Sequence, residues 1–259
     1  MKRKVGYNLI MVDVRFGEKL AEGKTKIIYA HPADPALAYM VHKDTISAGD
    51  GARRNVIQGK GALSCRTTSN VFKLLAQAGL PTHFVEKTDE TTMLVRRCQM
   101  IPLEVVMRRM ATGSYLKRHP EVAEGTRFEP LLVEFFLKDD ARHDPQIMPE
   151  DISREGIASA AEVEAMAALG RKTFETLEMA WAAQDVTLVD LKIEFGRDAE
   201  GHLLVADVID NDSWRIWPGG QRERMLDKQI YRDMKQVDAD GLSLILAKYE
   251  QVADLTENF

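Results

Sequence analysis

Short apolar stretches separated by glycine, proline and aspartate fill the first half of the chain and predict β-strands. One helix, Ser64–Ala78, interrupts them. Gly79 and Pro81 follow this helix in the order that is typical of a helix end. The strands predicted in this half are Lys26–Ala30, Leu37–His42, Thr82–Lys87 and Thr91–Arg97.

The second half of the chain is richer in helix. Apolar residues recur every three or four positions from Val163 to Trp181 and predict one long helix whose apolar stripe faces the core. Two strands, Thr187–Phe195 and His202–Ile209, follow and are joined by a turn at Gly196–Gly201. Further helices are predicted near Arg222–Lys235 and Asp240–Leu255.

This order of elements predicts an α+β fold with two lobes, because strands come first, helices come later and a hairpin lies between helices. The chain has 259 residues, which is compatible with one large domain or two closely packed subdomains. We expect a β-rich lobe over residues 17–105 and an α/β lobe over residues 106–259, with the boundary near Pro102–Arg109. Residues 1–16 are expected to be an extension that the fold does not need.

The composition is that of a folded globular protein, with 45% hydrophobic and 29% charged residues. The formal net charge of −5 gives no positive field for nucleic acid or an anionic membrane, so we expect neither as a partner. No apolar run approaches the length that spans a bilayer. Cys65 and Cys98 cannot form a disulfide framework and lack zinc spacing, so we expect reduced thiols in a cytoplasmic protein.

The segment Gly23-Lys24-Thr25 resembles the end of a phosphate-binding P-loop, but two features exclude that motif. Glu18 stands where the pattern needs its first glycine, and the segment leads into a predicted strand rather than a helix. A glycine turn between two strands can still direct Lys24 and Lys26 at phosphates, as nucleotide-covering loops do. An ordinary hairpin with solvated lysines is the alternative.

Two further glycine pairs lack the third glycine of a dinucleotide-binding fingerprint. They are Gly49-Asp50-Gly51 and Gly59-Lys60-Gly61, and a Rossmann fold is therefore not predicted. The first pair lies close to Arg53. Backbone N–H groups exposed by two glycines beside an arginine suit the binding of a carboxylate.

The strand Leu188–Phe195 carries the strongest chemical signal. Strict alternation places its apolar residues on one face and Asp190, Lys192 and Glu194 on the other. If the return strand pairs Asp207 with Lys192, Asp207 lies diagonally beside Glu194. Two such carboxylates repel each other unless a cation lies between them, and Mg²⁺ prefers oxygen ligands of this kind. A solvated face crossed by salt bridges is the alternative.

The segment Arg108–Ser114 combines an arginine pair with glycine and hydroxyl groups and is a candidate phosphate seat. Taken alone, an arginine pair is more often part of an ordinary surface.

Seven segments together resemble the SAICAR synthetase family and occur in its order, from about residue 18 to the C-terminal helix. These segments are Glu22–Lys26, Ser47–Ala52, Met100–Pro102, Arg109–Ser114, Lys138–Asp140, Leu188–Gly196 and Asp207–Trp217.

One detail of the resemblance concerns the branch of the family. Many bacterial members have Ser-Pro-Asp where this chain has Ile209–Trp214, and in this respect the chain is more similar to the synthetase half of the animal bifunctional enzyme. The carboxylase half of that enzyme has no counterpart here. A homo-oligomer is compatible with the resemblance, which does not specify one.

The resemblance implies a two-lobed fold in which an antiparallel β lobe covers ATP and an α/β lobe holds a ribotide. It also implies an ATP-dependent ligase that joins carboxyaminoimidazole ribotide to L-aspartate through an amide in purine biosynthesis. ATP phosphorylates the ribotide carboxylate, and the amine then displaces phosphate. Positioning and charge neutralisation would supply most of the catalysis.

The resemblance assigns ATP, Mg²⁺ and the substrates to particular residues. By similarity, Lys192 lies where the reacting carboxylate would be and Asp190 orients it; with Lys24 these are the expected catalytic residues. Flanking carboxylates should keep Lys192 protonated, so its role would be electrostatic rather than that of a base. The other assignments are Lys24, Lys26 and Lys138 for the ATP phosphates, Ile28, Leu37 and Met100 for adenine, Glu194 and Asp207 for Mg²⁺, Arg108, Ser114 and Arg215 for the ribotide phosphate, Asp212 elsewhere in the substrate site, and Asp50 and Arg53 for L-aspartate.

Two other functions use some of the same parts. A kinase would bind ATP with the same lysines, but it would need a catalytic-loop HRD and a DFG string, and neither occurs in the sequence. A non-catalytic ribonucleotide sensor would keep Arg108 and Arg215 but would not need Glu194 and Asp207. The acidic pair therefore favours the enzyme.

Overall fold

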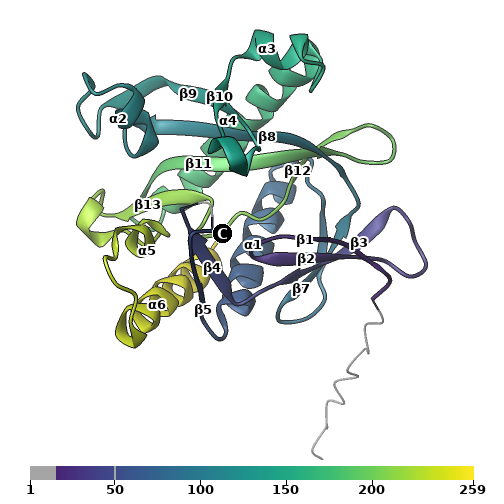
Figure 1. Ribbon diagram of the computed structural model, residues 1–259, viewed down its shortest axis with the longest axis horizontal. Helices are drawn as coiled ribbons and strands as arrows, with labels where there is room; N and C mark the ends of the chain where they lie inside the picture. The colour runs from purple at the N-terminus through teal and green to yellow at the C-terminus, as the bar shows by residue number, and fades with distance from the viewer. Residues whose placement is uncertain (1–15, 50) are drawn as a thin grey trace, which may run out of the picture.

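Two antiparallel β-sheets form the frame of the molecule (Figure 1). The computed structural model describes residues 16–49 and 51–259. The first sheet is made of Lys19–Glu22 (β1), Lys26–Ala30 (β2), Leu37–His42 (β3), Phe84–Lys87 (β6) and Thr92–Arg96 (β7). Their order is β1-β2-β3-β7-β6.

The second sheet is larger and has one long strand near its centre. It is made of Gln99–Met110 (β8), Arg127–Leu137 (β9), Gln146–Ile147 (β10), Val186–Arg197 (β11), Leu203–Ala206 (β12) and Trp214–Pro218 (β13). The order is β10-β9-β8-β11-β12, and β13 also pairs with β11. A separate hairpin joins Thr45–Ala48 (β4) to Arg53–Val56 (β5).

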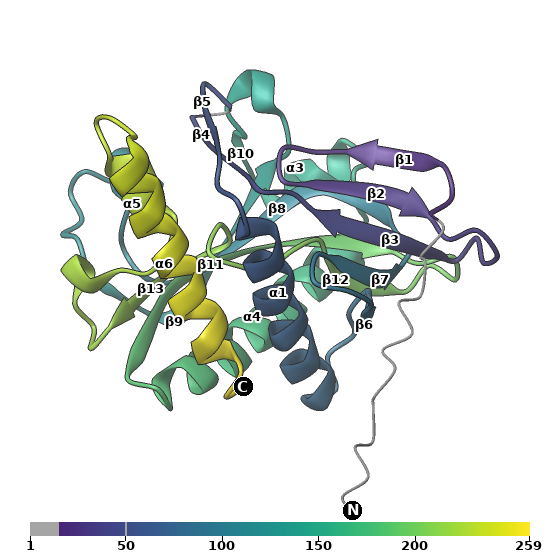
Figure 2. The same ribbon diagram turned by 90° about the horizontal axis from the view of Figure 1, so that it is seen from below.

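The helices pack around these sheets and confirm the α+β class. They are Lys60–Gln77 (α1), Ser114–Arg118 (α2), Pro149–Arg154 (α3), Ala160–Ala182 (α4), Gln229–Asp233 (α5) and Ala239–Thr256 (α6). Helix α4 packs on the second sheet, while α1 contacts the first sheet and lies side by side with α6 (Figure 2). Through this contact the C-terminal helix α6 packs against the N-terminal half of the chain.

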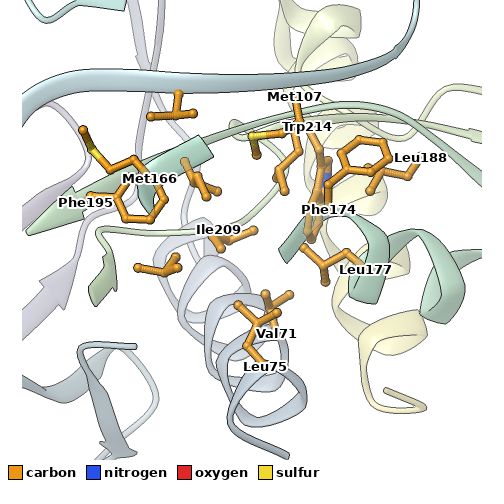
Figure 3. Packing of buried hydrophobic residues seen from close by; sticks show 14 of the residues in the cluster. Val71, Leu75, Met107, Met166, Phe174, Leu177, Leu188, Phe195, Ile209 and Trp214 are labelled. Carbon is orange, nitrogen blue, oxygen red and sulfur yellow. The ribbon is translucent and has the colours of Figure 1, made fainter. Parts of the chain in front are cut away.

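One apolar core joins α1, α4 and the second sheet. Val71 of α1, Phe174 and Leu177 of α4, and Trp214 of β13 converge in it (Figure 3). The first three are completely buried and Trp214 is nearly so. Because burial of each large apolar side chain stabilises the fold by about 1.5–3 kcal/mol, this core fixes the two halves of the chain against each other.

The structure differs from the predicted elements in several places; strands β4, β5, β10 and β13 and the short helices α2 and α3, for example, were not predicted. Helix α1 begins at Lys60 rather than Ser64, directly after Gly59, whose positive φ of 88° suits a glycine. Strands β8 and β9 were not predicted, and β8 runs through the boundary expected between residues 105 and 106. The helix expected near Arg222–Lys235 is instead a 3₁₀ turn followed by the short α5.

Two histidines are almost completely buried between the first sheet and its neighbours. The exposed fractions of His42 and His83 are 5% and 3%, and burial lowers the pKa of each imidazole to about 3. Both rings are therefore neutral in the folded protein at physiological pH. The Nδ1 atom of His42 lies 3.0 Å from the hydroxyl of Ser64.

These histidines predict sensitivity to acid. The unfolded chain takes up protons below the ordinary pKa of about 6.5, whereas the folded chain does not until about pH 3, so stability should fall as the pH falls through this window. We expect a loss of about 1.5 kcal/mol per histidine between pH 6.5 and pH 5. Urea unfolding at both pH values measures it, with exposed His202→Gln as a control that should leave the loss unchanged. A flat profile over this range would contradict the prediction.

Both cysteines are free thiols. Cys65 is buried in a small apolar cluster with Met40 and Met93, and Cys98 is partly exposed. Burial raises the pKa of both thiols to about 11, so neither is a thiolate at neutral pH. In the ranges 16–49 and 51–259, no helix has the length and apolar character that crossing a membrane requires.

Candidate active site

A charged cavity of about 550 Å³ opens between the two sheets. Turns from the N-terminal half meet the faces of β8 and β11 and the segments after β12 there. Both cations and carboxylates line its walls. Its charged lining consists of Lys24, Lys26, Arg108, Lys138, Lys192, Arg215, Lys228 and Arg232, with Glu104, Asp144, Asp190, Glu194, Asp207 and Asp212.

The turn between β1 and β2 brings two lysines to this cavity. Gly23, Lys24 and Lys26 line it, and β1 and β2 pair antiparallel on either side of the turn. The structure thus confirms the glycine turn between two strands. The turn of the β4–β5 hairpin contributes Gly49 and Gly51 close by, since a Cβ at Gly51 would lie 3.8 Å from Cε of Lys24.

Strand β11 presents its charged face to the cavity, as its alternation predicts. Asp190, Lys192 and Glu194 line the cavity, while Leu191 and Ile193 belong to the apolar core. The predicted pairing of Lys192 with Asp207 is wrong, because Glu194 pairs with Ala206 and the ladder ends there. Asp207 follows with a positive φ of 68° and reaches the cavity from the end of β12.

Glu194 and Asp207 are buried carboxylates, with exposed fractions of 3% and 8%. Glu194 accepts from Nζ of Lys138 at 2.7 Å and from Nζ of Lys192 at 3.1 Å, and Asp207 forms an ion pair with Lys26. Burial alone would raise the pKa of Asp207, but the lysines, Lys26 above all, hold it below its usual value. Both groups offer carboxylate oxygens to the cavity, and such ligands fit Mg²⁺.

Lys192 separates two facing carboxylates. Glu194 of β11 and Glu104 of β8 are direct cross-strand partners, and like charges in that position repel. The Nζ atom of Lys192 lies 3.1 Å from a carboxylate oxygen of each. Burial opposes its charge, but Glu194, Glu104 and Asp207 together raise the pKa of the Lys192 ammonium. Lys192 is therefore protonated, as the sequence predicts.

The hydrogen-bond partners that the structure gives Asp190 are two arginines rather than Lys192, so the expected orienting role of Asp190 stays a prediction. Asp190 stands directly between Arg108 of β8 and Arg215 of β13 in the strand registers. Its Oδ2 accepts from Nη1 of Arg108 at 3.0 Å and also from Nη1 of Arg215. Asp190 therefore fixes two arginines side by side.

The two arginines and α2 make a candidate anion seat. Nη2 of Arg108 donates to the hydroxyl of Ser114 at 3.3 Å, although Ser114 itself does not line the cavity. Gly113 lies against Arg215, where a Cβ would come within 2.5 Å of Nη2. With a φ of +58° as well, this position requires glycine. The three expected phosphate-binding residues are thus brought together.

The three expected adenine contacts are not part of the cavity lining. Ile28 of β2 packs against the small apolar cluster that contains Met40 and Met93. Leu37 begins β3 and is half-buried. Met100 is 42% exposed on β8, opposite Gly196 of β11.

The loop after β12 carries a second acidic pair, of which Asp210 is buried and Asp212 is partly buried. Asp212 accepts from Nζ of Lys228 at 2.7 Å and from the hydroxyl of Tyr249. Burial alone would raise the pKa of Asp212, but the positive charge of Lys228 outweighs this effect, and the pKa lies below its usual value. Asp210 is deeper and accepts from the Ser64 hydroxyl; burial, and then the charge of Asp212, raises its pKa.

Four charged residues of the cavity were not predicted from the sequence, namely Glu104, Asp144, Lys228 and Arg232. Lys228 and Arg232 occur in Asp227-Lys228-Gln229 and Tyr231-Arg232-Asp233, two short charged strings that were available as a signal. Glu104 lies in a strand that was not predicted, so nothing placed it opposite Glu194.

The residues expected to bind L-aspartate are placed differently. Asp50 lies outside the described residues. Arg53 does not line the cavity: its Nη1 donates to the backbone carbonyls of Tyr231 at 2.9 Å and Met234 at 2.7 Å. Arg53 thereby holds the end of the β4–β5 hairpin against α5, the helix that carries Arg232.

Comparisons with known proteins agree with this geometry. The family model described as SAICAR synthetase matches residues 19–243. A phosphoribosylaminoimidazole-succinocarboxamide synthase of Roseiflexus castenholzii is 68% identical over 244 residues, which are 94% of this chain and 98% of that protein. A solved structure, SAICAR synthetase (Type-2) in complex with ADP, superposes with a TM-score of 0.82 at 32% identity and covers 91% of this chain and 96% of its own.

The animal enzymes are also similar, but less closely. The mouse bifunctional phosphoribosylaminoimidazole carboxylase/phosphoribosylaminoimidazole succinocarboxamide synthetase is 47% identical over 253 residues, which are 95% of this chain and 60% of the mouse protein. The expected likeness to the synthetase part of that enzyme is present. The bacterial relative is nevertheless the closer of the two.

Proposed function

The chain belongs to the SAICAR synthetase family, and we infer that it joins carboxyaminoimidazole ribotide to L-aspartate through an amide, with cleavage of ATP to ADP and phosphate, in purine biosynthesis. The observation that best supports this function is the cavity itself. It combines lysines and buried carboxylates at one end with an arginine pair at the other. A ligase with three anionic substrates needs such an arrangement, because each substrate brings negative charge to the same place.

ATP is assigned to the end of the cavity beneath the β1–β2 turn. Lys24, Lys26 and Lys138 bind its phosphates there, and Glu194 and Asp207 hold Mg²⁺. A bound Mg²⁺ would neutralise charge on the transferring phosphoryl group. In the free protein Lys26 and Lys138 pair with these same carboxylates, so binding exchanges one set of ionic partners for another.

The ribotide is assigned to the arginine end. Arg108 and Arg215, with the hydroxyl of Ser114, grip its phosphate, since fork-shaped guanidinium groups suit phosphate oxygens. Lys192 lies between the two ends and holds the ribotide carboxylate against the γ-phosphate. One carboxylate oxygen attacks the γ-phosphorus as ADP leaves; the aspartate amine then attacks the carbonyl carbon and phosphate departs.

L-aspartate is assigned to the two cavity cations that have no role with the other substrates. These are Lys228 and Arg232, which follow Arg215 in the sequence and line the described part of the cavity. L-aspartate has two carboxylates, so each cation can pair with one of them. Asp212 holds Lys228 in place. Arg53 contributes indirectly, because it fixes the helix that carries Arg232. Cytoplasmic location and any homo-oligomer stay predictions, as do the adenine contacts of Ile28, Leu37 and Met100.

Phosphate release from ATP tests the function directly. The enzyme should release phosphate only when the ribotide and L-aspartate are both present, and one amide should form per phosphate. Release or transfer without aspartate would indicate a kinase. No release under any combination, together with ribotide binding, would indicate a sensor.

A further inference from the structure

Glu134 is a buried carboxylate that lies behind the arginine end of the cavity without lining it. It belongs to β9, the strand next to β8, and its exposed fraction is 5%. Its two oxygens accept from three different side chains, the two arginines described next and Gln146, whose Nε2 donates to Oε1 at 3.2 Å. Such a group must be fully satisfied to be tolerated in the interior, so its partners are held in fixed places.

The first partner is Arg108. Its Nε donates to Oε2 of Glu134 at 2.6 Å, while Nη1 donates to Asp190 at 3.0 Å. Glu134 and Asp190 therefore hold the guanidinium from two sides. The remaining donor group, Nη2, points to the hydroxyl of Ser114 at 3.3 Å. Arg108 thus reaches the anion seat with a single edge in a single orientation.

The second partner is Arg118 at the end of α2. Its Nη2 donates to Oε1 of Glu134, and its Nη1 donates to the backbone carbonyl of Ser114 at 3.2 Å. Its guanidinium also lies 5.1 Å from the ring centre of Phe136. The same carboxylate therefore fixes Arg108 directly and fixes the start of α2, with Ser114, through Arg118.

We propose that Glu134 is a positioning residue for the ribotide phosphate, acting through Arg108 and Arg118. This inference rests on the proposed function of the cavity. Glu134 offers one carboxylate oxygen to Arg108 and the other to Arg118. The two donors that would face the phosphate, Nη2 of Arg108 and the hydroxyl of Ser114, therefore keep their geometry when the site is empty. A pre-oriented guanidinium loses less freedom on binding, and that difference is expressed as affinity for the ribotide.

Glu134→Gln tests the proposal because the amide keeps the shape but can accept at only one of its two terminal atoms. We expect the KM for the ribotide to rise about tenfold, with the KM for ATP and the kcat changed by less than about twofold. Glu134→Asp keeps the charge, so its KM for the ribotide should lie between those of the wild-type protein and Glu134→Gln. Arg215→Ala, measured alongside, shows the size of the effect of losing a direct contact.

Glu178→Gln is the matched control. Glu178 of α4 accepts from both Nε and Nη2 of Arg109, the neighbour of Arg108 on β8, at 2.7 and 2.8 Å, and neither residue lines the cavity. This variant should lower the thermal midpoint to a similar extent while the KM for the ribotide stays unchanged. If Glu134→Gln lowers the midpoint in the same way with an unchanged KM, Glu134 is only a structural acid and the proposal is wrong.

A double variant tests whether Glu134 acts through Arg108. In an Arg108→Met background, the effect of Glu134→Gln on the ribotide KM should shrink to less than about threefold. Full additivity would overturn the proposed route. The wild-type protein is assayed first with ribotide and aspartate, so a failure of the ligase function appears before any variant is compared.

Discussion

Replacing Lys192 with methionine should lower kcat by about 10²–10³-fold while the protein stays folded, because the variant keeps the apolar stem and loses one preorganised charge. Lys192 lies at the centre of the cavity, 3.1 Å from both Glu104 and Glu194, and its ammonium is protonated. In the proposed mechanism it offsets the charge that builds as the ribotide carboxylate meets the γ-phosphate. Single-turnover phosphate release and thermal unfolding measure the two quantities.

A purely structural Lys192 would give a different result. The lysine keeps two facing glutamates apart, so its loss could act through repulsion between them. Lys192→Met combined with Glu104→Gln removes that repulsion and restores the local charge balance. If the double variant recovers both stability and turnover, the catalytic role is wrong. If it recovers stability alone, the charge of Lys192 itself is needed.

Glu194→Gln and Asp207→Asn should each reduce ATP-dependent turnover by about 10²-fold or more, because each removes one of the two proposed Mg²⁺ ligands with little change of shape. The loss should be largest at limiting Mg²⁺. Binding of Mn²⁺ in the presence of ADP, followed by its paramagnetic signal, gives a readout that does not depend on activity. It should weaken in both variants.

Asp254→Asn serves as the control for this pair. Asp254 of α6 is also a carboxylate in an ion pair, since it accepts from Nη2 of Arg66 at 2.6 Å, but it lies outside the cavity. We expect normal Mn²⁺ binding and turnover from it. Unchanged Mn²⁺ binding in Glu194→Gln would show that these carboxylates serve only as partners of the lysines.

The charged face of β11 could be predicted from the sequence because alternation along a strand is a local property. Asp190, Lys192 and Glu194 face the cavity for that reason alone. The position of Asp207 could not be predicted in the same way, since the register depends on the turn length and on where pairing stops. The ladder ends at Ala206, and a positive φ then turns Asp207 toward Lys26.

The partners of these side chains depend on strands that the pattern did not predict. Strands β8 and β9 each contain a proline, Pro102 and Pro130, which weakens a strand prediction. Arg108 consequently had no predicted neighbour, although it stands opposite Asp190 in the register. The same gap hid Glu104 and Glu134. The residue types of the site could thus be predicted from the sequence, whereas the pairing of their side chains could be known only from the tertiary structure.

The cavity also has a consequence for the order in which the protein is made. Its walls include Lys24 near one end of the chain and Arg232 near the other, and Arg53 must find the carbonyls of Tyr231 and Met234 to fix the hairpin. Because synthesis proceeds from the N-terminus at about 5–20 residues per second, the N-terminal wall leaves the ribosome some ten seconds or more before its counterpart. During that interval the nascent chain holds only part of an ionic site, which is completed when the segment with Lys228 and Arg232 emerges.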